Sequence, residues 1–414
     1  MPASLTKNAV KAIGSVKKAK NAISIYIDLK AQTVHFFLHP LSDKAEPSYE
    51  AHSFRQRTFD QNFFRSLTDI TSGYASAHSE AADAVITLVL PDYLFALDTL
   101  SIPTLGRKKT DGALDVMLDG LYKNRKELFL NTVCAHAGKK ITTYSSVAFN
   151  RSFHASFVSA CTAGNMKPDC VTFRSNAYAN AVSMLDTKYS SSSYLMLNIC
   201  QNESTFVFVS KGRATGFYPM PFGYKLLQRS SVVAENLLFD HDTAELAVLN
   251  AKEKAKAKQL TTMRTSENGE ENQDAAGQPE STLSPDDPTV SITVDSAVKE
   301  LPRKVARVVP KAMQRPAPRN QEEAAYENFT VFMKWALHLL EENDKLVAIG
   351  RPETILVNLP DDCAHVIETA NAEREENGIS FTRLDLSSRE ETVREHLDLV
   401  GGLCSPAMNK INNF

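Results

Sequence analysis

Apolar and polar positions alternate along two stretches that lie far apart in the chain. Residues 21–39 (NAISIYIDLKAQTVHFFLH) and 194–223 (YLMLNICQNESTFVFVSKGRATGFYPMPFG) each hold short runs of strand-forming residues separated by polar turns. The first stretch predicts a β-hairpin. The second predicts two strands joined by a tight turn, followed by a Gly-marked turn at 211–212 and a third strand. A similar unit therefore opens both halves of the chain.

The residues between these stretches predict mixed helices and strands. An apolar stripe at helical spacing predicts a helix within 54–77, and the nearly continuous apolar run Ala84–Leu90 is typical of a strand buried on both faces. A strand, a helix and a hairpin then predict a small α+β insertion, after which the chain returns to its parent sheet. The further segments are strands at 93–102, 128–136, 140–149 and 168–173, and helices at 108–122, 150–163 and 175–185.

A change of composition divides the second half. Residues 259–320 are rich in Glu, Asn, Gln, Ser, Pro and Gly and contain no aromatic residue, so we expect a disordered linker. Its basic part, 299–319, follows an acidic segment and serves either as a partner tether, as a contact to an anionic surface, or as a plain solvated linker.

Order is predicted again from residue 321. A stripe that includes Phe329 and Met333 predicts a core helix at 326–340, and the strand, helix and strand at 354–359, 363–375 and 381–384 predict a continued sheet. The last helix, 397–408, contains Gly401 and Gly402, which suit either a ligand or close helix packing.

Composition excludes several classes of protein. A chain of 414 residues with 43% hydrophobic residues is expected to form more than one domain or lobe, and a net charge of −3 gives no pull toward nucleic acid. The six scattered cysteines favour reduced thiols in a cytosol, and no apolar run approaches the length of a membrane span. Residues 1–20 predict a frayed basic leader, with a helix resting on an anionic membrane as the alternative.

The order and spacing of these elements resemble the PilM-like assembly proteins of type IV pilus systems, which are relatives of the cell-division protein FtsA. The resemblance covers about residues 22–249 and 321–414. It is carried by VITLVLPDYLFALDTLSIP, SFVSACTAGNMKPDCVTF, LMLNICQNESTFVFVSKG and FYPMPFG, and near the end by PETILVNLP and VGGLCSPAMNKINNF.

This resemblance implies an α/β chain with a two-lobed actin-like (ribonuclease H-like) fold. The first lobe would span 21–186, with an inserted α+β subdomain at about 91–150. The second lobe would span 187–258 and 321–414, interrupted by the linker. Family members bind ATP between the lobes. They lie at the cytoplasmic face of the inner membrane and hold the cytoplasmic tail of the membrane protein PilN in a groove of the first lobe.

The nucleotide-binding turns of the family are degraded in this sequence. The first keeps Asp28 but has Lys30 where glycine is expected, and the second has Asn198 in place of an aspartate and retains only Thr205 in type. The third replaces a glycine pair with residues 358–360, Asn-Leu-Pro. Added side chains crowd a phosphate, and an amide is a poor ligand for magnesium. We therefore expect Asp28, Asn198 and Thr205 to form a vestigial nucleotide site, or to be ordinary turn and strand residues, with no catalytic residue, no metal ligand and no required cofactor. Weak binding of ATP and magnesium is the alternative.

The predicted function is a cytoplasmic scaffold, peripheral at the inner face of the membrane, in a type IV pilus or related secretion assembly. It would bind the tail of a PilN-like inner-membrane protein and other assembly components, without hydrolysing ATP. The alternatives are an active ATPase or kinase of the actin-like superfamily and a self-associating, FtsA-like filament. An enzyme needs a carboxylate base and a metal site in the cleft, and Asp28 is the only acid in the matching position.

Overall fold

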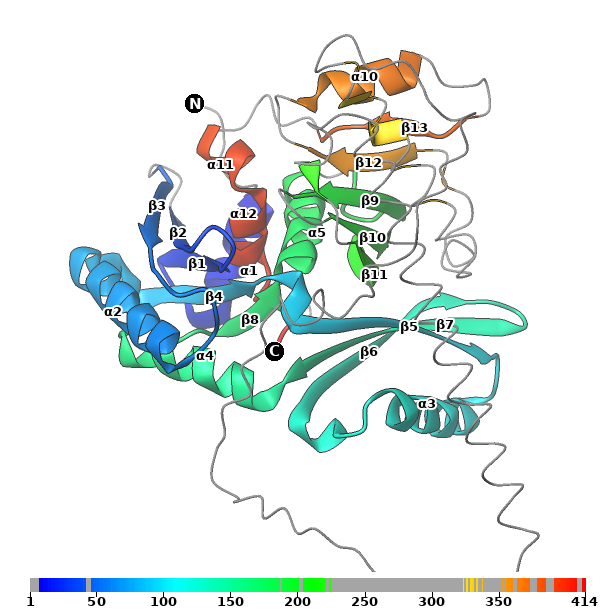
Figure 1. Ribbon diagram of the computed structural model, residues 1–414, viewed down its shortest axis with the longest axis horizontal. Coiled ribbons are helices and arrows are strands. Elements are labelled where there is room, and N and C mark those ends of the chain that lie inside the picture. Colours follow the sequence, from blue (N-terminus) through cyan, green and yellow to red (C-terminus); the bar gives the residue numbers. More distant parts are fainter. Residues whose placement is uncertain are drawn as a thin grey trace, which may run out of the picture.

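The computed structural model describes residues 7–41, 46–186, 188–200, 204–220 and 223–224. It also describes isolated positions from 323 to 337, and then 352, 354–359, 363–372, 378–384, 391–407 and 412–414. The predicted linker at 259–320 lies outside the described residues. So does Trp335, which belongs to the predicted helix at 326–340. The described elements form two lobes and an inserted three-stranded sheet (Figure 1).

The first lobe is built on a five-stranded sheet of order β3-β2-β1-β4-β8. Its central strand β1 (Asn21–Asp28) is antiparallel to β2 (Thr33–Pro40), which in turn pairs with β3 (Ser48–Ser53). On its other side β1 is parallel to β4 (Ala84–Leu90), and β4 is parallel to the edge strand β8 (Cys170–Phe173). The predicted hairpin and the predicted buried strand are both confirmed.

Helices cover both faces of this sheet. Phe36 and Phe37 are neighbours in β2 and point to opposite faces, as the two-residue period of a strand requires. The Phe36 ring stacks on Tyr74 of α2 (Gln61–Ala77) at 4.1 Å, while Phe37 meets His396 at 6.5 Å. Helix α4 (Arg151–Ala163) packs beside α2, and Asn150 caps it by accepting from the backbone N–H of its first residues, as predicted.

The basic N-terminal segment is not a frayed leader where the structure describes it. Residues Lys7–Lys17 form helix α1, and Ile13 in its middle is fully buried against the first lobe. The Lys17 ammonium forms an ion pair with Asp169 just ahead of β8. Burying one isoleucine stabilises a docked helix by about 1.5–3 kcal/mol, which explains why the leader packs against the lobe.

The second lobe repeats the topology of the first. Its sheet has the order β11-β10-β9-β12-β13, again three antiparallel strands followed by two parallel ones. The strands are β9 (Tyr194–Ile199), β10 (Ser204–Ser210), β11 (Arg213–Met220), β12 (Thr354–Asn358) and β13 (Ser380–Thr382), with helix α10 (His365–Ala372) packed beside β13. Phe329 and Met333 are buried in the core of this lobe, as the sequence predicted.

The inserted subdomain follows β4. It contains β5 (Phe95–Pro103), α3 (Arg107–Leu121), β6 (Leu128–Ala137) and β7 (Ile141–Asn150), which form an antiparallel sheet of order β5-β7-β6. Strand β11 of the second lobe contacts all three of these strands. The insertion is therefore joined to both lobes, at the lower right of Figure 1.

Two helices lie at the junction of the lobes. Helix α5 (Arg174–Leu185) contacts strands of both sheets, and ten of its twelve residues are buried. Helix α12 (Leu397–Cys404), preceded by α11 (Glu391–Glu395), packs against α5 and against β1 and β4. The predicted second lobe ran through residue 414, but α12 packs on the first sheet, because its glycine face fits between that sheet and α5.

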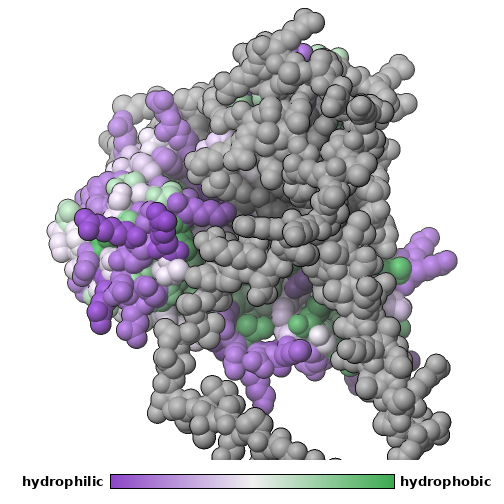
Figure 2. Space-filling view, in the orientation of Figure 1, coloured by the Kyte–Doolittle hydropathy of each residue, from purple (hydrophilic) through white to green (hydrophobic). Residues whose placement is uncertain are grey.

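The glycine pair of α12 serves helix packing. A Cβ on Gly401 would overlap the Ala177 carbonyl of α5, and a Cβ on Gly402 would overlap Ser24 and Val89 of the first sheet. Of the two expected roles, close packing is the one observed. One continuous apolar core results, which joins residues of the first sheet to Met196, Val207 and Phe217 of the second. The outer surface over α2 is mainly hydrophilic, at the left of Figure 2.

Candidate functional site

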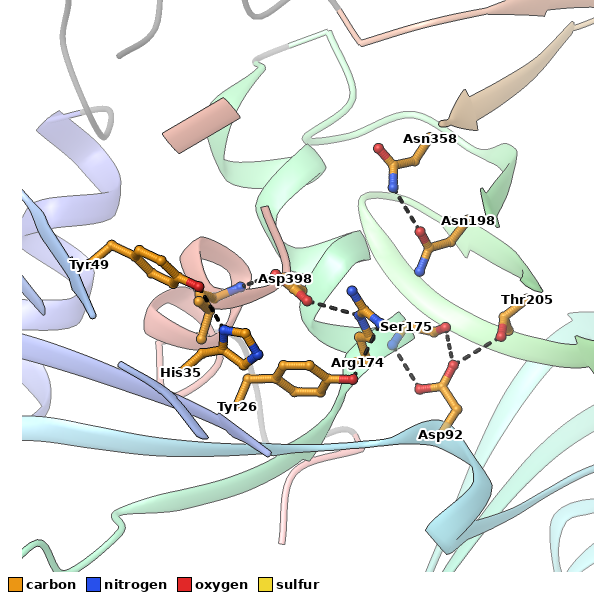
Figure 3. Close-up of polar contacts among 11 residues, drawn as sticks. Tyr26, His35, Tyr49, Asp92, Arg174, Ser175, Asn198, Thr205, Asn358 and Asp398 are labelled. Carbon is orange, nitrogen blue, oxygen red and sulfur yellow. Dashed lines mark hydrogen bonds and ion pairs between the residues drawn. The ribbon is translucent and has the colours of Figure 1, made fainter. Parts of the chain in front are cut away.

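The candidate site lies between the lobes, where parallel strands of both sheets end. In open α/β sheets, ligands bind beyond the carboxyl ends of such strands. Asp92 follows β4, Arg174 follows β8, and Asn198 and Asn358 lie near the ends of β9 and β12. Figure 3 shows these side chains directed toward one another across the junction.

Asp92 is the buried centre of the first group of contacts. Its carboxylate accepts hydrogen bonds from the backbone N–H of Ser175 at 2.9 Å, from the Ser175 hydroxyl, and from the Thr205 hydroxyl at 2.9 Å. Ser175 begins α5 and Thr205 belongs to β10, so this one carboxylate links the inserted subdomain, the first lobe and the second lobe. Burial raises the pKa of Asp92 above its ordinary value, although its hydrogen bonds and the nearby Arg174 oppose that shift.

Arg174 and Asp398 form the second group. The Arg174 Nε donates to Asp398 Oδ2 at 2.8 Å, and the other side of the guanidinium donates to the Tyr26 hydroxyl at 3.3 Å. Both charged side chains are largely buried, at 22% and 9% exposed. The Arg174 guanidinium is thus already neutralised by a carboxylate of the same chain.

Asn198 and Asn358 pair with each other. They stand opposite one another in the parallel pairing of β9 and β12, and Asn358 Nδ2 donates to Asn198 Oδ1 at 2.8 Å. Asn198 is 1% exposed. The residues expected at the second and third nucleotide-binding turns therefore satisfy each other's polar groups at the junction.

Asp28 bonds within its own turn and not across the junction between the lobes. Its Oδ1 accepts from the backbone N–H of Ala31 at 2.9 Å, inside the turn between β1 and β2. The ammonium of Lys30, which replaces the expected glycine, lies 5.8 Å from the centre of the Tyr93 ring. Asn198 and Thr205 are paired in the β9–β10 hairpin, whereas Asp28 caps its own turn in the first lobe.

A stack of aromatic and imidazole rings extends from the ion pair into the first lobe. His35 lies between Tyr26 and Tyr49, and its Nδ1 is 2.7 Å from the Tyr49 hydroxyl. The Tyr49 ring stacks on His396 at 3.7 Å, directly ahead of α12. Burial lowers the pKa of both His35 and His396.

The polar side chains at the junction bond to other residues of the same chain. The carboxylates of Asp92 and Asp398 accept from residues of the same chain, and no group of three His, Cys, Asp or Glu side chains suited to a metal occurs in the part of the chain that the structure describes. The arrangement joins elements that are distant in sequence, as expected of a structural network.

Asp28 is the acid that the sequence places at a matching motif position, and the structure adds two carboxylates at the junction, those of Asp92 and Asp398, which the sequence reasoning missed. The sequence did carry a signal for Asp92, which follows the apolar strand β4 by two positions, where a carboxylate points to the sheet edge. Arg174 comes directly after β8 in the same way. Asp398 had no such signal, because α12 packs on a sheet whose strands precede it by more than 200 residues.

No family model matches the chain, and no curated protein sequence matches it significantly. Among solved structures, one described as the PilM–PilN type IV pilus biogenesis complex aligns over 94% of this chain and 98% of its own, at 8% identity and a TM-score of 0.52.

Two other similar structures cover about half of the chain. The cytoplasmic domain of EpsL, an inner membrane component of the type II secretion system of Vibrio cholerae, aligns over 52% of this chain and 74% of its own, at 10% identity and a TM-score of 0.34. A protein of Bacteroides thetaiotaomicron with an actin-like ATPase fold aligns over 56% and 79%, at 10% identity and a TM-score of 0.28. The repeated sheet topology and the near-complete alignment show that this chain has a two-lobed actin-like fold and shares its architecture with the PilM–PilN structure.

Proposed function

We propose that this chain is a cytoplasmic scaffold of a type IV pilus or related secretion assembly, which binds the cytoplasmic tail of a PilN-like inner-membrane protein. The observation that carries the proposal is the alignment with the PilM–PilN structure over 94% of the chain. Because the two sequences are only 8% identical, the alignment indicates a common architecture. The partner is proposed by analogy with the PilN of that complex.

The contacts at the lobe junction support a scaffold that does not hydrolyse ATP. Phosphoryl transfer needs a magnesium ion, donors that face the phosphates and a group that orients the attacking water. Here Asp92 bonds Ser175 and Thr205, and Arg174 bonds Asp398. A triphosphate with magnesium would have to break these buried contacts before it gained any of its own.

The inserted subdomain has the surface expected of a partner-binding element. Six large apolar side chains are exposed among the described residues, and five of them lie between positions 93 and 141. Val116 on α3 is the most exposed, at 73%, followed by Ile141 at 55% and Leu121 at 47%. Exposed apolar side chains that gather on one subdomain are typical of protein contact sites.

Association with the membrane would be peripheral. No helix in the described ranges is long and apolar enough to cross a bilayer. The first 27 residues contain five lysines and no acidic residue, and of these Lys11, Lys18 and Lys20 are exposed on or after α1. Lysines near an anionic membrane surface contribute about 1 kcal/mol each, which is enough to orient a protein that a membrane partner already holds.

A binding titration tests the proposal. The cytoplasmic tail of each single-span membrane protein encoded beside this chain is made as a labelled peptide and titrated with the full chain, with and without Mg-ATP. We expect one tail to bind with micromolar affinity, independently of nucleotide, while its scrambled control does not bind. Absence of binding by every tail would contradict the scaffold, and binding that requires ATP turnover would favour the ATPase alternative.

A further inference from the structure

Residues 412–414 occupy the free edge of the first sheet. Strand β8 is the last strand of that sheet, and Val171 in its middle exchanges two backbone hydrogen bonds with Phe414. The Phe414 N–H donates to the Val171 carbonyl at 2.8 Å, and the Val171 N–H donates to the Phe414 carbonyl at 2.9 Å. Such a reciprocal pair is one rung of an antiparallel ladder, so the segment extends the sheet by one short strand.

The Phe414 side chain enters an aromatic site of the inserted sheet. Its ring centre lies 5.8 Å from Phe95, 6.0 Å from Phe149 and 6.2 Å from Phe129, so β5, β7 and β6 each contribute one ring. His154 of α4 borders the same site, where burial lowers the pKa of its imidazole and a hydrogen bond to the Phe414 backbone opposes that shift. The site thus lies between the first lobe and its insertion.

Two amides fix the position of the segment. Asn412 donates to the carbonyl of Ala214 in β11 at 3.2 Å and to the side chain of Asn176 in α5 at 3.4 Å. Asn413 donates to the Ser405 carbonyl at 2.8 Å. The three residues are therefore recognised at the backbone, at one aromatic side chain and at two amides, as a bound peptide is.

The segment is not buried evenly, since Asn412 is 2% exposed whereas the Phe414 side chain is partly exposed. Phe95 and Phe149 are 6% and 1% exposed, whereas Phe414 is only partly buried against them. Asn412 adopts a left-handed φ of 60°, which an L-residue other than glycine adopts at a cost. Only one backbone rung joins the segment to β8, so we expect it to open locally without unfolding the sheet beneath it.

We infer that the edge of β8 and the Phe95–Phe129–Phe149 site together form a peptide-binding site, and that residues 412–414 are its resident ligand. Its external ligand is an extended peptide that adds to β8 as a strand and inserts one large apolar side chain between the three rings. This inference rests on the proposed function, since the tail of the membrane partner is the peptide that would displace residues 412–414.

A peptide of the chain's own sequence is the probe. Labelled SPAMNKINNF, residues 405–414, is titrated by fluorescence anisotropy with the intact chain and with the chain shortened to residue 411. We expect the shortened chain to bind the peptide at least tenfold more tightly than the intact chain, and the same peptide with alanine for Phe414 to lose at least tenfold in affinity. Equal binding by both chains, or by both peptides, would overturn the site.

Hydrogen exchange of the intact chain provides a test that needs no variant. If residues 412–414 dissociate locally, the amides of Val171 and Phe414, which bond each other's carbonyls, exchange at least a hundredfold faster than those of β4. Exchange of all three at the same rate would make the segment part of the cooperative fold and overturn the inference. Neither test uses the membrane partner, so a failure of every partner tail to bind would count against the proposed function alone.

Discussion

The side chains of Arg174 and Asp398 form an ion pair, 2.8 Å from Nε to Oδ2, although the two residues are 224 positions apart in the sequence. The pair ties the start of α5 to the start of α12, and Tyr26 of β1 completes it. It lies at the carboxyl ends of the strands of the first sheet, where open α/β sheets bind their ligands. The junction of this protein is therefore built from contacts between its own elements.

Breaking this ion pair on one side should be costly. Asp398→Ala leaves the Arg174 guanidinium buried without its carboxylate, and we expect it to lower the free energy of unfolding by about 3–5 kcal/mol. The double variant Arg174→Met/Asp398→Leu should lose much less, because no unpaired charge remains. Urea denaturation of Arg174→Met, of Asp398→Leu and of the double variant measures the coupling, and losses that simply add would contradict a direct pair.

Asp92 should show the pH dependence of a buried acid. Because its pKa is raised in the fold, its contribution to stability is complete below its ordinary pKa and is lost as the pH rises through the folded value. Asp92→Asn cannot ionise, so the stability of the native protein relative to this variant should be greater at pH 5 than at pH 8. Denaturation of both proteins at the two pH values tests the sign, and the opposite order would contradict the raised pKa.

Removal of the Asp92 side chain should be worse than its neutralisation. Asp92→Ala leaves the hydroxyls of Ser175 and Thr205 without their acceptor, at a cost of about 1–3 kcal/mol for each buried group that finds no other partner. The asparagine variant retains an oxygen in the same place. Equal losses of unfolding free energy for the two variants would show that the three contacts do not stabilise the junction.

Gly401 should tolerate no side chain. A Cβ at this position overlaps the backbone carbonyl of Ala177, so Gly401→Ala must push α12 away from α5, and we expect a loss of about 1–3 kcal/mol in unfolding free energy. Gly120 in α3 is the matched control, because a Cβ there meets nothing within 4 Å. Gly120→Ala should be neutral or stabilise the protein by up to about 1 kcal/mol. Equal effects at the two glycines would refute close packing.

The imidazoles beside the ion pair should make the protein sensitive to acid. Burial lowers the pKa of His35 and His396, so their contribution to stability is complete above the ordinary histidine pKa of 6.5 and is lost as the pH falls through the folded values. The contribution of these two groups to the free energy of unfolding should therefore fall between pH 7 and pH 5. His35→Gln should reduce that fall, and an unchanged pH profile in this variant would contradict the assignment.

Much of the architecture was predictable from sequence because it depends on local pattern. The alternation around β1 and β2, the apolar run of β4, the cap at Asn150 and the hairpin that opens the second lobe all reflect neighbouring residues. The docking of α1 was not predicted, because the helix packs against β4 and α12, which lie far along the chain, as well as against the adjacent β1. The same limit applies to the junction, since the Arg174–Asp398 pair arises only when α12 returns to the first sheet.

We propose that the protein's own side chains fill the junction between the lobes, so that it does not bind ATP. Thermal unfolding of the full chain with and without 1 mM Mg-ATP checks this proposal, with release of inorganic phosphate followed in the same samples. We expect an unchanged melting temperature and no phosphate. A ligand with a Kd of about 10 µM would add about 2.7 kcal/mol of stability at that concentration, and such a shift, with or without phosphate release, would refute the proposal.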